Sequence, residues 1–227
     1  MKTEALLLAS GDMNRFYKQG ESNVKAGRLK DFSFAKRASS YDAGFEGKAV
    51  RKFYNLLLRE IDLPPGAAVL DVGCGTGALL KRLADKSNIA GYGIDAEEKM
   101  IAEAKKKCPE MRFDISRCDS LPYGDGSFDI VIACMAYHHF DNKAGFAGEA
   151  ARVIKPGGVL YIVDPRFPWV IRKALNGILR IVRMAGAFYK PQEIVASFAP
   201  FGFAGVGSAC DGYAQVVKLQ KSMPAAL

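Results

Sequence analysis

Two kinds of hydrophobic pattern alternate along the chain from residue 67 to residue 164. Short apolar runs of strand length are separated by longer segments in which apolar residues recur at helical spacing. Strands that alternate with helices form parallel βαβ units, whose right-handed crossovers bring the carboxyl ends of the strands to one edge of a sheet. The pattern predicts strands over 67–71, 89–95, 111–118, 129–134 and 159–164, and helices over 46–61, 78–86, 97–107 and 143–154.

The predicted fold class is therefore α/β, with a Rossmann-like doubly wound sheet and helices on both faces. Ligands of such sheets bind beyond the carboxyl ends of the strands, near the point where the strand order reverses. The tail of the chain adds two further strand candidates, 202–208 and 213–219, on either side of Gly212. We expect these two strands to form a hairpin at the edge of the sheet.

The chain has 227 residues, which is enough for one domain with a core of its own. Its five cysteines are scattered and include no CxxC pair, so we expect no metal site and a reducing, cytoplasmic compartment. No apolar run reaches the ~20 residues that a membrane-spanning helix needs. The formal net charge of +8 suits a nucleic acid, an anionic membrane surface or solubility alone, so its distribution matters more than its sum.

The first predicted strand runs into a glycine loop, Asp71-Val72-Gly73-Cys74-Gly75-Thr76-Gly77. Glycines permit turns that a Cβ would forbid and let a ligand approach the backbone, while the helix that follows offers free N–H groups to the same space. Such a turn alone is a weak signal, since it also suits NAD or no ligand at all. The spacing here is GxGxG, with an acid two residues before the first glycine, and differs from the GxGxxG of dinucleotide folds.

Two further acids follow predicted strands. Asp95 ends the second strand, 18 residues after Gly77, where a carboxylate can accept hydrogen bonds from two ribose hydroxyls; the alternative is a cap for the helix over 97–107. Asp119 follows the third strand. As a hydrogen-bond acceptor it suits an exocyclic amine, and the alternative is a polar turn before Pro122.

As a set, these motifs resemble those of the class I S-adenosylmethionine (SAM)-dependent methyltransferases, in particular the small-molecule enzymes related to the ubiquinone and menaquinone C-methyltransferases. The glycine loop resembles their motif I. The run SFDIVIA at 127–133, followed by HHF at 138–140, resembles their fourth-strand signature, and 155–160 resembles the loop before their fifth strand. An upstream element of the family is similar to Ser39-Ser40-Tyr41-Asp42, so the resemblance covers residues 36–165.

The resemblance implies a sheet of seven strands whose last strand is antiparallel, which the tail hairpin would complete. It also implies SAM as the cofactor and S-adenosylhomocysteine as its product. The glycine loop would then hold the methionine part of SAM, the acid after the second strand the ribose, and the acid and backbone after the third strand the adenine. The residues predicted to bind the cofactor are Tyr41, Asp71, Gly73, Cys74, Gly75, Gly77, Asp95, Ala96, Met100, Asp119, Ser120, Leu121 and Cys134.

The only two histidines, His138 and His139, are adjacent at the end of the fourth predicted strand. A histidine beside the transferred methyl group can act as a general base, and His139 is the catalytic candidate. The alternative is that the pair only caps the strand and shapes the pocket. Because adjacent strand residues point to opposite faces, the pair is a poor metal site. The cofactor brings the reactive methyl, so a base is needed only where the acceptor must lose a proton.

The first 45 residues are polar and basic and show no strand pattern. We expect residues 1–45 to form an N-terminal helical extension over the site, and residues 46–227 to form the methyltransferase domain. Within that domain, residues 166–200 are predicted to be a basic amphipathic insertion on the acceptor side, because the region after the fifth strand often shapes the acceptor site in the related enzymes.

The segment between Asp164 and Glu193 contains six basic residues and no acid. By their spacing, one helical face carries Arg172, Asn176, Arg180 and Arg183. We predict that the segment 166–190 helps to admit a hydrophobic or anionic acceptor and makes peripheral contact with a membrane surface. The alternative is a surface helix with a solvated basic face.

The predicted function is methyl transfer from SAM to a small hydrophobic or anionic molecule. An RNA methyltransferase is the alternative that the net charge suggests, but Cys134-Met135-Ala136-Tyr137 stands where amino-group methylases carry a Pro-Pro motif, and no RNA-binding module is recognisable. The glycine spacing disfavours an NAD-dependent oxidoreductase. A protein that binds SAM without turnover is a third alternative. The sequence leaves the acceptor atom open and allows a homodimer.

Overall fold

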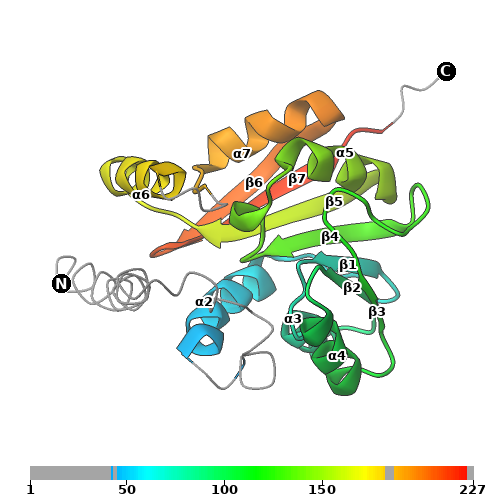
Figure 1. Cartoon of the computed structure of the whole chain (residues 1–227). Coiled ribbons are helices and arrows are strands. Elements are labelled where there is room, and N and C mark those ends of the chain that lie inside the picture. Colours follow the sequence, from blue (N-terminus) through cyan, green and yellow to red (C-terminus); the bar gives the residue numbers. More distant parts are fainter. Residues whose placement is uncertain (1–41, 43–44, 182–186, 224–227) are drawn as a thin grey trace.

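The structure is a computed structural model that describes residue 42 and residues 45–181 and 187–223 (Figure 1). Most of the predicted N-terminal extension, Tyr41 and Arg183 therefore lie outside the described residues. The predicted division of the chain at residue 45 stays a prediction. Among the described residues, no helix is both long enough and apolar enough to cross a bilayer.

A single sheet of seven strands has the order β3-β2-β1-β4-β5-β7-β6. The first five strands are parallel, while β7 runs antiparallel to both β5 and β6. This arrangement confirms the predicted doubly wound sheet and its antiparallel last strand. The strands are β1 Ala68–Val72, β2 Ala90–Asp95, β3 Arg112–Ile115, β4 Phe128–Cys134, β5 Ile154–Pro165, β6 Phe203–Asp211 and β7 Ala214–Lys221.

Helices cover both faces of the sheet, as predicted (Figure 1). One buried cluster joins the sheet to α2, α3 and α4, and a second joins it to α5 and α7. Central strands such as β1 and β4 read as nearly continuous apolar runs because they are buried on both faces. The helices are α2 Phe45–Glu60, α3 Ala78–Lys86, α4 Glu98–Lys107, α5 Lys143–Val153, α6 Trp169–Ile181 and α7 Pro191–Phe198.

Three strand boundaries differ from the prediction by three residues or more. Strand β6 ends at Asp211, three residues late. Strand β3 ends at Ile115, three residues early, because the chain turns there and the Ser120 N–H bonds to the Arg117 carbonyl at 3.2 Å. Strand β5 begins at Ile154, five residues early, and includes the Pro-Gly-Gly segment that was predicted as a loop. Ile154 pairs with Phe128, and a register shift in β4 accommodates the proline, which has no N–H to donate.

The predicted basic helix is present as α6, but the face that carries Arg172 and Asn176 lies against the protein. Arg172 Nη1 is 2.7 Å from Glu193 Oε2 of α7. The Asn176 amide donates to the Phe188 carbonyl and accepts from its N–H, both at 2.9 Å. The basic face predicted for solvent or a membrane therefore serves packing at these two positions, and the opposite face is exposed.

Candidate functional site

The glycine loop connects β1 to α3, and each of its three glycines has a positive φ, between 53° and 80°. A Cβ at Gly73 would lie 2.6 Å from the Ala136 Cβ, and one at Gly77 would lie 3.1 Å from the Phe113 ring, so the protein itself requires glycine at both positions. At Gly75 a Cβ would meet nothing within 4 Å. Gly75 is therefore the point of the loop where a ligand can approach the backbone.

Asp95 links the glycine loop to α4. Its Oδ2 accepts a hydrogen bond from the Gly75 N–H at 3.0 Å, and its Oδ1 accepts from the Glu97 N–H at 2.9 Å. Burial raises the pKa of Asp95, and the bonds from the backbone N–H groups oppose that rise. The carboxylate thus joins the glycine loop to Glu97, the residue that precedes α4, and each of its oxygens can accept a further hydrogen bond from a hydroxyl.

Asp71 is buried beneath the loop with only 2 % of its surface exposed. Its Oδ1 has no hydrogen-bond partner among the described residues. Burial, reinforced by the nearby charge of Asp95, raises the pKa of Asp71 to about 8. Buried polar groups are nearly always paired, so an orphaned carboxyl oxygen marks a place for a further partner.

The two cysteines predicted to touch the cofactor are buried beside this acid. Burial, with the charge of Asp71 added, raises the pKa of both the Cys74 and the Cys134 thiol well above the ordinary value. Both side chains are therefore protonated near neutral pH and act as small apolar groups, not as nucleophiles.

Asp119 lies on the loop after β3, and its carboxylate is already paired. Oδ1 is 3.0 Å from Arg117 Nε, and Oδ2 is 3.1 Å from Asn142 Nδ2. These bonds lower the pKa of Asp119, so that it is ionised near neutral pH. The Ser120 N–H bonds within the turn, and the Leu121 N–H donates to Glu149 Oε2 at 2.6 Å. The predicted adenine contacts would have to share these groups.

The remaining predicted positions fall around the same edge of the sheet. Ala96 is exposed at the carboxyl end of β2, whereas Met100 is buried in the first turn of α4. Cys134 ends β4, and the Ala136 side chain that follows faces Gly73. The structure thus brings residues from three neighbouring strand ends together at the switch in strand order between β1 and β4, where the fold places ligands.

The two histidines occupy a short 3-10 turn, η4 Tyr137–His139. Met135, which leads into it, is the one non-glycine residue with a positive φ (55°) among the described residues. His138 Nδ1 lies 2.9 Å from Asp164 Oδ1, and both side chains are buried. A carboxylate can only accept, so Nδ1 carries the proton and Nε2 is left as the basic nitrogen.

His139 differs from its neighbour in that its side chain is exposed. The two rings are in contact, with centroids 3.9 Å apart. In the structure, the buried carboxylate of Asp164 is paired with His138. The sequence pattern instead favoured His139 as the catalytic histidine.

An aromatic wall stands beside His138. Phe188 stacks on the His138 ring at a centroid distance of 5.3 Å, and Phe167 meets Phe188 edge to face at 4.9 Å. The Ala187 N–H also donates to the His138 carbonyl at 3.0 Å. Neither Asp164 nor Phe188 was among the sequence candidates. The sequence could have indicated Asp164, because it is the last residue of the predicted fifth strand, as Asp95 is of the predicted second strand.

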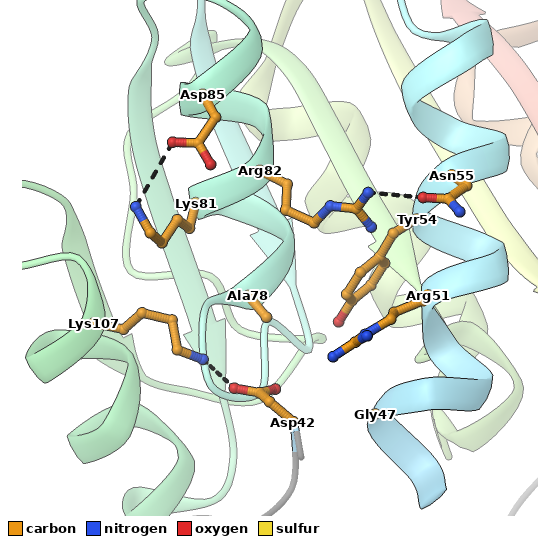
Figure 2. Close-up of a pocket in the computed structure, with 10 residues that line it drawn as sticks. All are labelled: Asp42, Gly47, Arg51, Tyr54, Asn55, Ala78, Lys81, Arg82, Asp85 and Lys107. Carbon is orange, nitrogen blue, oxygen red and sulfur yellow. Dashed lines mark hydrogen bonds and ion pairs between the residues drawn. The ribbon is translucent and has the colours of Figure 1, made fainter. Parts of the chain in front are cut away.

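A separate surface pocket of about 500 Å³ lies between α2, α3 and the end of α4 (Figure 2). Within it Asp42 accepts hydrogen bonds from the Thr76 hydroxyl at 2.9 Å and from the Lys107 ammonium group, which ties the segment before α2 to the glycine loop. None of the predicted cofactor residues that the structure describes lines this pocket. Its lining residues are Asp42, Gly47, Arg51, Tyr54, Asn55, Ala78, Lys81, Arg82, Asp85 and Lys107.

Residues 70–162, which contain the glycine loop and β1 to β5, match the family described as a methyltransferase domain. The matched segment and the order of the seven strands are those of a class I SAM-dependent methyltransferase domain. A Haloferax volcanii protein, solved in complex with a methyltransferase activator, has the same fold as this domain. The match has a TM-score of 0.71 at 18 % identity and covers 84 % of this chain and 98 % of that one.

Two curated relatives of the methyltransferase domain are enzymes named for quinone substrates. The 2-methyl-6-phytyl-1,4-hydroquinone methyltransferase of Synechocystis sp. is 39 % identical over 105 residues, covering 45 % of this chain and 33 % of that enzyme. The demethylmenaquinone methyltransferase of Chlorobaculum parvum is 36 % identical over 100 residues, covering 44 % of this chain and 42 % of that enzyme. The chain thus spans less than half the length of these relatives.

Proposed function

We propose that this protein transfers a methyl group from SAM to a small hydrophobic acceptor and releases S-adenosylhomocysteine. The observation that carries the proposal is the glycine loop itself. Its open position at Gly75 is held by Asp95 and lies above Asp71, a buried carboxyl with an unpaired oxygen. A cationic ligand beside this carboxyl would favour its ionised form, which suits a ligand whose methionine part approaches the backbone.

The polar groups of the predicted residues match those of SAM, because carboxylates lie where SAM would present hydrogen-bond donors or positive charge. Asp71 would balance positive charge on the methionine part, Asp95 would accept from the ribose hydroxyls, and Asp119 would accept from the adenine amine. When bound, SAM supplies a methyl group activated by its sulfonium. The residues proposed to line the cofactor are those predicted from the sequence: Tyr41, Asp71, Gly73, Cys74, Gly75, Gly77, Asp95, Ala96, Met100, Asp119, Ser120, Leu121 and Cys134.

We assign the general base to His138, not His139. Asp164 holds the Nδ1–H of His138, which leaves Nε2 to take a proton from a hydroxyl of the acceptor. Loss of that proton makes the oxygen of a hydroquinone more nucleophilic, and its ring carbons as well, so the same base serves O- and C-methylation. Phe188 and the neighbouring rings would exclude water from this side.

A hydrophobic acceptor is supported by the two relatives, one of which is named for a phytyl-bearing hydroquinone and the other for demethylmenaquinone. The aromatic residues next to His138 suit a ring of this kind. A hydroquinone with a short alkyl tail is therefore the first acceptor to test.

Isothermal titration and a turnover assay test the proposal together. We expect SAM and S-adenosylhomocysteine to bind with similar affinity, NADH to give no heat, and S-adenosylhomocysteine to accumulate when the hydroquinone is added. Preferential binding of NADH would sink the proposal. Binding of SAM without release of S-adenosylhomocysteine for any acceptor would instead favour a binding protein. SAM-dependent methylation of tRNA, with a steep salt dependence of binding, would favour the RNA alternative.

A further inference from the structure

Helix α6 exposes several large hydrophobic side chains to solvent. Val170, Ile171 and Ile178 lie on the side opposite Arg172 and Asn176, whereas Trp169 is the first residue of the helix and is exposed at its end. Four of the seven large hydrophobic side chains that are exposed among the described residues lie on this one helix: Trp169, Val170, Ile171 and Ile178, each at least half exposed. Exposed hydrophobic side chains that occur singly need no explanation, but a cluster on one element marks an interaction surface.

The direction in which this face points is fixed by the other side of the helix. Arg172 is paired with Glu193 of α7, and Asn176 makes two hydrogen bonds to the backbone of Phe188. These contacts hold the inner face against the protein, so the apolar face cannot turn inward without breaking an ion pair and two hydrogen bonds. Figure 1 shows α6 projecting at the side of the molecule next to α7.

Positive charge accompanies the apolar face. Lys173 is exposed, with its Nζ 4.8 Å from the centre of the Trp169 ring, and Arg166 is exposed just before the helix. No acidic residue occurs between Asp164 and Glu193 in the sequence. A tryptophan with a neighbouring lysine on an apolar helix face is the composition of segments that lie in the headgroup region of a bilayer. A second copy of this chain would bring the same positive charges together and repel.

We propose that the exposed surface of α6, made up of its first residue Trp169 with Val170, Ile171, Lys173 and Ile178, docks on an anionic phospholipid bilayer. The same helix fixes Phe188 through Asn176, and Phe188 stacks on His138. The bilayer contact and the wall of the acceptor site are thus opposite faces of one element. A hydrophobic acceptor leaves the lipid beside its proposed site, which is the one part of the inference that rests on the proposed function.

Trp169 is the only tryptophan in the chain, so the protein's intrinsic tryptophan fluorescence reports on the exposed start of α6. The full-length protein is titrated with vesicles of phosphatidylcholine alone and with vesicles that contain phosphatidylglycerol as well. We expect a blue shift, and quenching by brominated lipid, with the anionic vesicles only. Lys173→Gln should weaken partitioning about fivefold, and the double variant V170E/I178E should weaken it about tenfold or more.

Ile115→Glu is the matched control, because Ile115 is 55 % exposed at the end of β3, on another element. It should partition like the wild type. Equal response to neutral and anionic vesicles, no response to either, or unchanged partitioning of V170E/I178E would overturn the proposal. A concentration-dependent blue shift without lipid would overturn it too, in favour of self-association. SAM titration of the same variants separates this outcome from a failure of the methyltransferase proposal.

Discussion

At the scale of single residues, Asp71 connects stability with ligand binding. Its pKa is raised to about 8 from an ordinary value of 3.8, so between these two pH values the folded protein holds a proton that the unfolded chain has lost. The free energy of unfolding attributable to Asp71 therefore falls as the pH rises through this window. A cationic ligand placed beside the carboxyl would favour its ionised form and reverse the shift.

We predict that SAM binding releases a proton from Asp71 and that the affinity for SAM rises between about pH 6 and about pH 8. Titration calorimetry in buffers of different ionisation enthalpy measures both effects. Asp71→Asn keeps the shape of the side chain but should bind SAM about tenfold more weakly, without proton release. A SAM affinity that does not change with pH in the wild type would contradict the assignment of Asp71 to the cofactor site.

The second residue-scale prediction separates the two histidines. Replacing the base in His138→Gln should lower kcat about 100-fold to 1,000-fold with little change in SAM affinity. Asp164→Asn should have a similar effect because it changes the proton position on the His138 ring. His139→Gln is the control and should cost less than about fivefold. A larger loss in His139→Gln than in His138→Gln would return the catalytic role to His139.

At the scale of elements, the turn from β1 to α3 is built by close approach to the end of β4. Gly73 and Gly66 both have a φ of +80°, but a Cβ at Gly73 would lie 2.6 Å from the Ala136 Cβ, while one at Gly66 would meet nothing within 4 Å. Substituting Gly66 therefore measures the cost of backbone strain alone, whereas substituting Gly73 measures backbone strain together with a steric clash.

Gly66→Ala should lower the free energy of unfolding by about 1 kcal/mol, the cost of a left-handed conformation for a residue with a Cβ. Gly73→Ala should lower it by about 3 kcal/mol, since the clash with Ala136 is added. Urea denaturation followed by circular dichroism measures both variants. Equal losses would mean that the end of β4 yields to the added methyl group and that the close approach does not constrain the loop.

The helix α6 illustrates what a pattern of spacing leaves undecided. The sequence predicted a helix here, and the structure has one, with Arg172 and Asn176 of the predicted basic face on the same side. It did not predict which face meets the protein, because Glu193 and the Phe188 backbone, the partners of Arg172 and Asn176, come from later segments. Because Arg172 and Asn176 bond to these partners, their side of α6 faces the protein, and Val170, Ile171 and Ile178 are left exposed.

At the scale of the whole molecule, the tail of the chain completes the sheet. Strand β7 lies between β5 and β6 and pairs with both, while β6 is an edge strand that is largely exposed. Val217 of β7 is fully buried, whereas Val206 of β6 is 48 % exposed. The domain should therefore unfold as one unit that includes its last strand.

The same chemical change at these two positions tests this dependence. Val217→Asp should cost about 4 kcal/mol or more, because an unpaired carboxylate enters the core. Val206→Asp should change the free energy of unfolding by less than about 1 kcal/mol. Hydrogen exchange of β5 amides should accelerate in V217D alone. Native-like protection of β5 in V217D would show that the tail docks on a sheet that is stable without it.

The sequence by itself determined the order of strands and helices, the closing hairpin and the glycine loop, because hydrophobic period and glycine spacing are local properties of the chain. The tertiary structure decided which histidine faces a carboxylate, where the Asp71 oxygen is left unpaired and which face of α6 meets solvent. Each of these depends on atoms from segments far apart in the sequence, such as His138 with Asp164 and Asn176 with Phe188. Spacing along the chain carries no information about such pairs until the sheet brings the strand ends together.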